Sequence, residues 1–262
     1  MTQQEWAFVR VVTHNEVARV SMNRPEARNA LSLEALDELT AVYRWLAEQS
    51  DLRVVVLEGA GKAFSVGFDL QSFASLLVGG KPDPAAIKEA ARRGKATVDA
   101  IVQCPMVTIC SVHGYVIGGG FLLAAACDIR VASESCIFSL PEVDLGLPLI
   151  WGGIPLLSRE LGLPLARELV LTGRKAAASE LHTRGFLHHL VGSNERQDRS
   201  VALAEELAGK PEWATRMVKE QFLECEQGVF RAESDEERFV QAVTDPRFLP
   251  HALRYVQGIR KG

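Results

Sequence analysis

The chain has 262 residues, of which 47% are hydrophobic and 24% are charged. This composition supplies enough apolar side chains for one large buried core and excludes a disordered or fibrous protein. Lys and Arg number 29 against 33 Asp and Glu, so there is no excess of cations to neutralise nucleic-acid phosphates. We therefore expect no nucleic-acid partner.

The cysteines are odd in number, widely spaced and mostly within apolar runs. Such a pattern predicts buried reduced thiols and favours a reducing cytoplasm over a disulfide framework or a zinc site. No stretch has the roughly 20 uninterrupted apolar residues that cross a bilayer, and the first ten residues lack a basic segment followed by an apolar core. We expect a soluble, unprocessed cytoplasmic protein with no membrane partner.

The first elements in chain order are a β-ribbon, a helix and a strand. Runs of β-branched and aromatic residues at 6–12 and 17–22 flank a short polar segment, which is typical of a hairpin. Ser32 is a candidate N-cap for a helix over 33–49, where leucines recur at helical spacing. A strand over 53–57 follows.

A polar helix is predicted over 84–103, and the continuous apolar run at 106–112 predicts a strand that is buried on both faces. Three consecutive glycines, Gly118 to Gly120, then open another helix. Short strands at 129–132 and 136–139 precede a largely helical remainder. This order predicts an α/β core of mostly parallel strands joined by right-handed crossovers.

We expect two regions, a core over residues 1–194 and a C-terminal helical region over residues 195–262 that makes oligomer contacts and closes the pocket. The stretch from Gly79 to Pro84 cannot continue a helix. It predicts a surface loop that borders the active site.

Two glycine-containing turns, at 61–70 and 113–122, each lie where a strand ends and a helix begins. A helix N-terminus presents unpaired N–H donors and a positive dipole end, which favour negative charge on a bound oxygen. A glycine triplet by itself is better explained by close packing of a helix on a sheet. Neither turn has the spacing of a nucleotide-binding loop.

Four segments stand in a distinctive order: Asn-Arg-Pro-Glu-Ala-Arg-Asn-Ala-Leu at 23–31, the Ala63 to Leu70 turn, the glycine triplet, and Cys-Asp-Ile-Arg at 127–130. In order and spacing they resemble the enoyl-CoA hydratase/isomerase (crotonase) superfamily. Matches at 141–147 and 171–173 extend the resemblance over roughly residues 5 to 192. It implies an α/β fold with a crotonase-like ββα spiral core and a C-terminal helical segment, assembled as a homotrimer or a dimer of trimers.

The resemblance also implies the substrate, a coenzyme A thioester, with no metal and no permanently bound cofactor. In that family two backbone amides form an oxyanion hole for the thioester oxygen, and here they are those of Phe68 and Gly119. The side chain of Asp69 is better explained as a loop or helix cap than as a catalyst, and simple solvent exposure explains Arg28 and Lys62 as well as ligand binding does. Residues that the resemblance assigns to coenzyme A are Ala27, Arg28, Ala30, Lys62, Ala63, Phe64, Val66, Asp69 and Leu70.

Family hydratases usually carry two glutamates, whereas this sequence has Leu122 at the first position and Glu142 at the second. Hydration commonly shares its proton transfers between two carboxylates, but moving a double bond needs one base. We predict isomerisation with Glu142 as the catalytic acid/base. A one-glutamate hydratase and a non-catalytic acyl-CoA-binding protein remain alternatives.

The acyl pocket is predicted to include Leu122, Trp151 and Phe73. Apolar neighbours of Glu142 should raise the pKa of its carboxyl, although a Glu after Pro can also cap a turn. Asp144 is expected to be mainly structural, because an extended backbone there would turn its side chain away. Other branches of the family place an acid near the position of Ile150, and this chain has none there.

Overall fold

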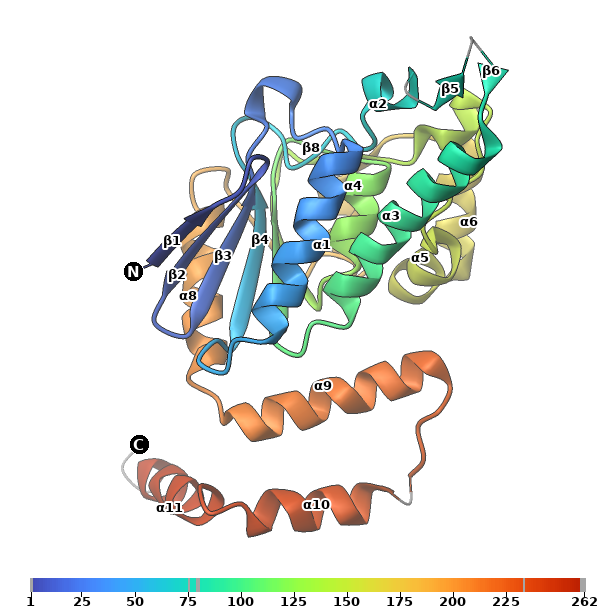
Figure 1. The fold of residues 1–262 in the computed structure, drawn as a ribbon. Helices are drawn as coiled ribbons and strands as arrows, with labels where there is room; N and C mark the ends of the chain where they lie inside the picture. Colours follow the sequence, from blue (N-terminus) through green and yellow to red (C-terminus); the bar gives the residue numbers. More distant parts are fainter. Residues whose placement is uncertain (1, 75, 79–80, 233, 260–262) are drawn as a thin grey trace.

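The computed structural model describes residues 2–74, 76–78, 81–232 and 234–259. A central sheet is covered on one face by α1 (Leu33–Ala47) and α3 (Pro84–Val102), and on the other face by α8 (Arg196–Ala208) (Figure 1). Successive residues of a strand point to opposite faces of the sheet. Because helices cover both faces, the strands carry apolar residues on both sides.

The central sheet has seven strands in the order β1-β2-β3-β4-β7-β9-β12. The first three are antiparallel neighbours, and from β3 onward every pair is parallel. This confirms the predicted N-terminal ribbon and the predicted parallel core. The strands are β1 Thr2–Glu5, β2 Val9–His14, β3 Val17–Met22, β4 Val54–Gly59, β7 Val107–Val112, β9 Ile129–Ser133 and β12 His189–Val191.

A second, three-stranded sheet continues from the ends of β7 and β9. In it β10 (Ile137–Ser139) lies parallel to β8 (Tyr115–Ile117) and antiparallel to β11 (Ala176–Ala177). Two of these strands are followed directly by the helices α4 (Gly119–Ala125) and η2 (Pro141–Leu145, a 3₁₀ helix). The small sheet therefore positions both the turn with the three glycines and Glu142.

The predicted N-cap of α1, Ser32, is present in the structure, and Asp83 caps α3 in the same way. Ser32 Oγ accepts a hydrogen bond of 3.2 Å from the Ala35 amide at the start of α1, and Asp83 accepts one from Ala85 at the start of α3. The remaining helices are η1 Pro25–Ala27, α2 Leu70–Ala74, α5 Gly153–Leu161, α6 Leu163–Thr172, α7 Ala178–Thr183, α9 Glu212–Gln227, α10 Ser234–Thr244 and α11 Phe248–Ile259.

The predicted surface loop before α3 contains a short antiparallel pair, β5 (Leu77–Val78) with β6 (Lys81–Pro82). Gly79 and Gly80 lie outside the described residues. Their neighbours Lys81 and Pro82 are exposed, as expected for a surface segment.

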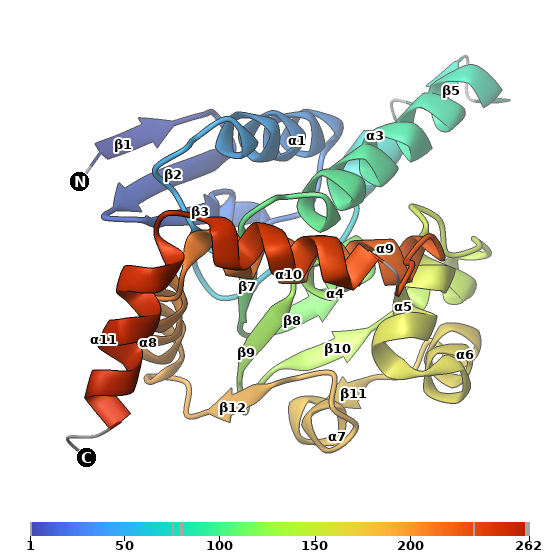
Figure 2. The same ribbon diagram turned by 90° about the horizontal axis from the view of Figure 1, so that it is seen from below.

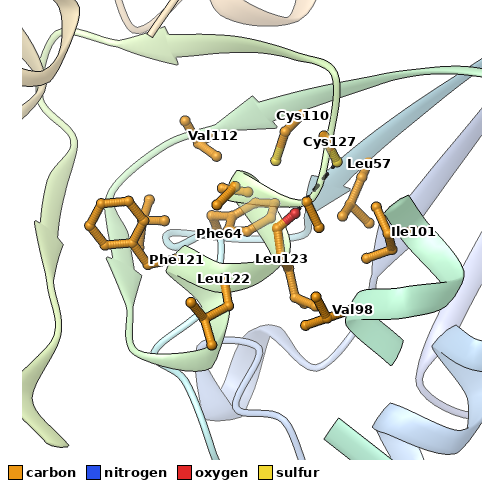
Figure 3. Packing of buried hydrophobic residues seen from close by; sticks show 14 of the residues in the cluster. Leu57, Phe64, Val98, Ile101, Cys110, Val112, Phe121, Leu122, Leu123 and Cys127 are labelled. Carbon is orange, nitrogen blue, oxygen red and sulfur yellow. Dashed lines mark hydrogen bonds between the residues drawn. The ribbon is translucent and has the colours of Figure 1, made fainter. Parts of the chain in front are cut away.

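The core is densest around α4, every residue of which is buried (Figure 3). Phe121 packs edge-on against Phe138 and Phe186, with ring centroids 5.1 and 5.2 Å apart. Cys127 Sγ donates to the Leu123 carbonyl at 3.5 Å and so helps to end this helix. All five cysteines are free and four are buried, as the sequence predicted.

The C-terminal region begins as part of the core. Leu203, Ala204 and Ala208 of α8 pack on Val54 and Ile109 of the sheet. In contrast, α9, α10 and α11 project from the sheet and run beneath it (Figures 1 and 2). The boundary between the two regions at residue 194 stays a prediction.

No helix among the described residues is long and apolar enough to cross a membrane.

Candidate active site

A cavity of about 530 Å³ opens where the two glycine-containing turns meet α3, η2 and the segment after η2. Its walls are almost entirely apolar side chains and glycine backbone. Among the described residues that line it, Glu142 and Asp144 are the charged ones. Phe68, Gly119 and Glu142 thus face one space, although the sequence holds them far apart.

Among the described residues, the Phe68 amide of the first turn has no acceptor. Leu31 donates to the Gly67 carbonyl at 2.8 Å, and Asp69 donates to the Leu31 carbonyl at 3.0 Å. In such a parallel bridge the intervening N–H, that of Phe68, points to the other side. Ser65 Oγ fixes the turn by accepting from the Gly67 amide at 3.1 Å.

The second turn requires glycine at Gly118, whose φ of +52° and ψ of −119° are strained for other residues. Its amide donates to the Ser139 carbonyl at 2.9 Å, which ties the turn to the small sheet. Gly119 then begins α4, and the first amides of a helix have no acceptor within it. A Cβ at Gly67 would come within 3.5 Å of the Gly119 nitrogen, so the two turns lie side by side.

Glu142 lies directly beside the second turn. A Cβ at Gly118 would be 2.7 Å from Glu142 Oε1, so glycine leaves room for the carboxyl. Glu142 Oε2 is buried and has no hydrogen-bond partner among the described residues. Burial raises the pKa of Glu142, as predicted, because the apolar surroundings disfavour the carboxylate. An unpaired carboxyl of this kind can exchange protons with a ligand.

Trp151 forms the inner wall of the cavity and is only 6% exposed. Its ring fits between Gly94 of α3 and Gly119 of α4, where any Cβ would overlap the indole. It also meets the Phe68 ring edge-on, with centroids 6.2 Å apart. The backbone of Trp151 has φ of +59°, which is uncommon for a bulky residue and marks a constrained position.

Leu122 and Phe73 were also predicted to line the acyl pocket. Leu122 is 1% exposed and lines the cavity at the place of the missing glutamate. Phe73 lies in α2, but its side chain is outside the described residues. The backbone around Asp144 is a 3₁₀ helix and not extended, and Asp144 lines the cavity while its carboxyl lies beside Gly173. Its mainly structural role stays a prediction.

The residues assigned to coenzyme A surround the first turn. Val66 and the 68% exposed Leu70 line the cavity itself. Arg28 and Lys62 are exposed, and the Val66 amide donates to the Arg28 carbonyl at 3.2 Å, which holds the two loops together. Ala27 and Ala30 flank Arg28 and are half-buried.

Three of those residues use their side chains for structure. Ala63 and Phe64 are fully buried in the core, so only their backbones could reach a ligand. Asp69 pairs with Arg24 at 3.0 Å and accepts from the Gln71 amide at 2.9 Å. This is the capping role that its residue type suggested.

Three residues of α3, Ile87, Ala90 and Ala91, line the cavity and were missed from the sequence. Their helix was recognised, but nothing in its periodicity shows which turn meets the site. No group of three or more His, Cys, Asp or Glu residues that could hold a metal ion occurs in the described part of the chain.

Residues 12–241 match the protein-family model for enoyl-CoA hydratase/isomerase. The chain belongs to the enoyl-CoA hydratase/isomerase family. This confirms the resemblance drawn from the motifs, and with it an enzyme family that acts on coenzyme A thioesters without a permanently bound cofactor.

Curated relatives include both isomerases and hydratases. The chain is 35% identical over 220 residues to a peroxisomal Delta(3,5)-Delta(2,4)-dienoyl-CoA isomerase of Arabidopsis thaliana, covering 80% of this chain and 79% of the relative. It is also 35% identical over 193 residues to the mevalonyl-coenzyme A hydratase sidH of Aspergillus fumigatus, covering 72% and 66%. The family is thereby shown, and the particular reaction is not.

Among solved structures, an enoyl-CoA hydratase from Bacillus anthracis superposes with a TM-score of 0.84 at 28% identity. The match covers 97% of this chain and 96% of that one. The predicted crotonase fold with helices at the C-terminus is therefore confirmed.

Proposed function

We propose that this protein is an enoyl-CoA isomerase that moves a carbon–carbon double bond along the acyl chain with a single acid/base, Glu142. The observation that carries the proposal is the single glutamate of this cavity: Glu142 is half-buried beside Gly118 and its Oε2 has no hydrogen-bond partner among the described residues, whereas Leu122 fills the place of the second family glutamate. One base suffices for a proton shuttle between two carbons.

In this mechanism the amides of Phe68 and Gly119 donate to the thioester oxygen. Glu142 removes a proton from C2 of a 3-enoyl thioester, and the electron pair of the C–H bond delocalises into the carbonyl as a dienolate. Protonation at C4 by the same carboxyl then gives the 2-enoyl thioester and returns Glu142 to its starting state. Fixed donors of this kind typically contribute about 3–4 kcal/mol each.

An apolar acyl group suits the cavity best. Leu70, Ile87 and Leu147 line it while remaining exposed, so they form an apolar mouth. Apart from Glu142, Asp144 and the Trp151 indole, no described lining side chain carries a hydrogen-bonding group. Arg28 and Lys62 are exposed near the first turn, where they could pair with coenzyme A phosphates.

Hydration is the second candidate, and Asp144 is the observation that favours it. Asp144 lines the cavity two residues after Glu142 and could help to hold a water molecule. The relative named as a mevalonyl-coenzyme A hydratase agrees with such chemistry within the family.

The decisive experiment incubates 2-enoyl- and 3-enoyl-CoA thioesters with the wild-type protein and Glu142→Gln in deuterated water, with mass spectrometry as the readout. We expect a bond shift with deuterium incorporation and no added water, reduced at least a hundredfold in the variant. Addition of water would establish a hydratase. Binding of the thioesters without turnover would establish the non-catalytic acyl-CoA-binding alternative.

We further propose a homotrimer or a dimer of trimers. In support, α10 has no buried residue among those described, and apolar side chains of α10 and α11 such as Phe239 and Leu249 are 70% and 62% exposed. A cytoplasmic location is also a proposal, supported by the five free cysteines.

A further inference from the structure

A second cavity, of about 610 Å³, lies on the face of the central sheet that α8 covers. It is found at the carboxyl ends of the parallel strands, beside the first turn of α8. It shares no lining residue with the cavity that holds Glu142. The two cavities are therefore lined by different residues, and Lys62, which is proposed above to contact coenzyme A, lines only the second of them.

The strand residues on this face change character along the sheet. Toward the start of the parallel strands they are valine and isoleucine and pack on Leu203 and Ala204 of α8. Toward the carboxyl ends the alternate positions carry Arg19, Ser21 and Glu58. These polar positions have no apolar cover from α8, so they leave a polar cavity in place of a packed interface.

The cavity is strongly cationic. Arg10, Arg19, Lys62 and Arg196 line it, against Glu58 as the single carboxylate among the described lining residues. Glu58 is already engaged, since its Oε1 accepts from Arg19 Nη2 and from Ser21 Oγ, both at 2.8 Å. Positive charge in the walls therefore exceeds negative charge by three.

Three buried donors in these walls lack an acceptor. The Nε atoms of Arg10, Arg19 and Arg196 are buried and have no hydrogen-bond partner among the described residues. Leaving a buried donor unpaired costs about 1–3 kcal/mol. An anion in the cavity would compensate the charge of these incompletely bonded guanidinium groups.

Arg196 is held in place before any ligand arrives. Its Nη1 donates to the Ser111 carbonyl at 3.2 Å and to Ser111 Oγ, which also accepts from Ser200 Oγ at 2.8 Å. Burial lowers the pKa of Arg196, so an anion beside it would relieve the cost of the buried charge. Arg196 is also the first residue of α8, where the helix dipole favours an anion.

We propose that this cavity is a binding site for a phosphate-bearing small molecule, distinct from the acyl-CoA site. Several guanidinium groups converge there, and their planar forks match the oxygens of a phosphate better than those of a single carboxylate. His113 also lines the cavity, and its Nε2 is bonded to the Gly61 carbonyl at 2.9 Å.

The test is calorimetric titration of inorganic pyrophosphate into the full-length protein at constant ionic strength. We expect saturable binding that Arg10→Gln and Arg196→Gln each weaken about tenfold or more. Arg167→Gln, which removes the same charge from the exposed face of α6, serves as the matched control and should leave the affinity unchanged. Thermal melts establish that each variant is folded.

Three results would overturn the proposal. Displacement of pyrophosphate by saturating coenzyme A would make the cavity an extension of the acyl-CoA site, through Lys62. Absence of binding in a protein that light scattering shows to be oligomeric would indicate that carboxylates of a second copy fill the cavity. Unchanged affinity in both arginine variants would exclude these residues as ligands.

Discussion

At the scale of single residues, Glu142 combines two properties that oppose each other. Its carboxyl must be ionised to remove a proton, yet burial raises its pKa and disfavours the ionised form. As the pH falls through this raised pKa, kcat/KM for isomerisation should fall with it. The ionised Glu142 carboxyl therefore lowers the free energy of unfolding at the pH where it removes a proton.

Glu142→Gln should accordingly stabilise the protein at neutral pH. A pKa that is higher in the folded state gives stability below the unfolded value, about 4.3, and loses it as the pH rises through the folded value. The melting temperature of the variant should exceed that of the wild type at pH 7 to 8, and the difference should shrink below about pH 4. Scanning fluorimetry across that pH range measures the difference in melting temperature. A difference that does not change with pH would contradict a destabilising effect of the ionised carboxyl.

Leu122 tests the choice between reactions. Leu122→Glu places a second carboxyl in the cavity that Glu142 lines, so hydration of 2-enoyl-CoA should rise above the wild-type level. Leu122→Gln is the control, because it has nearly the same shape without the charge. Equal hydration by both variants would mean that a second carboxylate is not what the wild type lacks.

At the scale of elements, the site depends on how α3, α4 and the segment after η2 meet at Trp151. Glycine in the middle of a helix usually costs about 0.5–1 kcal/mol relative to alanine. Gly94 nevertheless stands inside α3 where the indole ring touches this helix, and Gly119 at the start of α4 touches the same ring. Close packing around Trp151 compensates for the low helix propensity.

We predict that Gly94→Ala destabilises the protein by about 1–3 kcal/mol, the usual cost of overpacking, although alanine favours helices. The added methyl group would overlap the Trp151 ring. Urea unfolding measures the change, and Trp151→Leu in the same chain should recover part of it by making room. Stabilisation by Gly94→Ala alone would show that the ring can move aside.

At the scale of the whole molecule, α9 to α11 form an arm that the core barely covers. Lys219 of α9 is buried and bonds the Met106 carbonyl at 2.6 Å and Asp128 at 2.7 Å, which anchors the arm to the sheet. Arg238 joins α10 to Glu224 of α9. Beyond these polar links, α10 and α11 carry several exposed apolar side chains, as expected of a surface that a second copy covers: Phe239, Val240, Leu249, Leu253, Tyr255 and Val256.

Phe239→Asp should therefore shift the protein toward monomers, because it places a charge in the centre of the apolar surface on α10. Light scattering after size exclusion gives the mass of the assembly. Gln241→Asp, at another exposed position of α10, is the control and should leave the mass unchanged. A monomeric wild type would contradict the proposed oligomer.

The sequence by itself determined the elements and the chemistry of the backbone turns. Alternation, helical spacing and N-caps such as Ser32 and Asp83 are local signals, so the ribbon, α1, α3 and the parallel strands could be predicted. The motifs also pointed to Phe68, Gly119 and Glu142, which the fold gathers around one cavity. Their catalytic roles stay predictions.

Only the tertiary structure decided which distant residues meet. No local pattern pairs Gly94 with Trp151, places Ile87 at the mouth of the cavity or brings the Asp144 carboxyl beside Gly173. The gathering of Arg10, Arg19 and Arg196 is likewise invisible in the sequence, since they come from two strands and a helix far along the chain. Such contacts follow from how packed layers align, and periodicity within one element carries no information about that alignment.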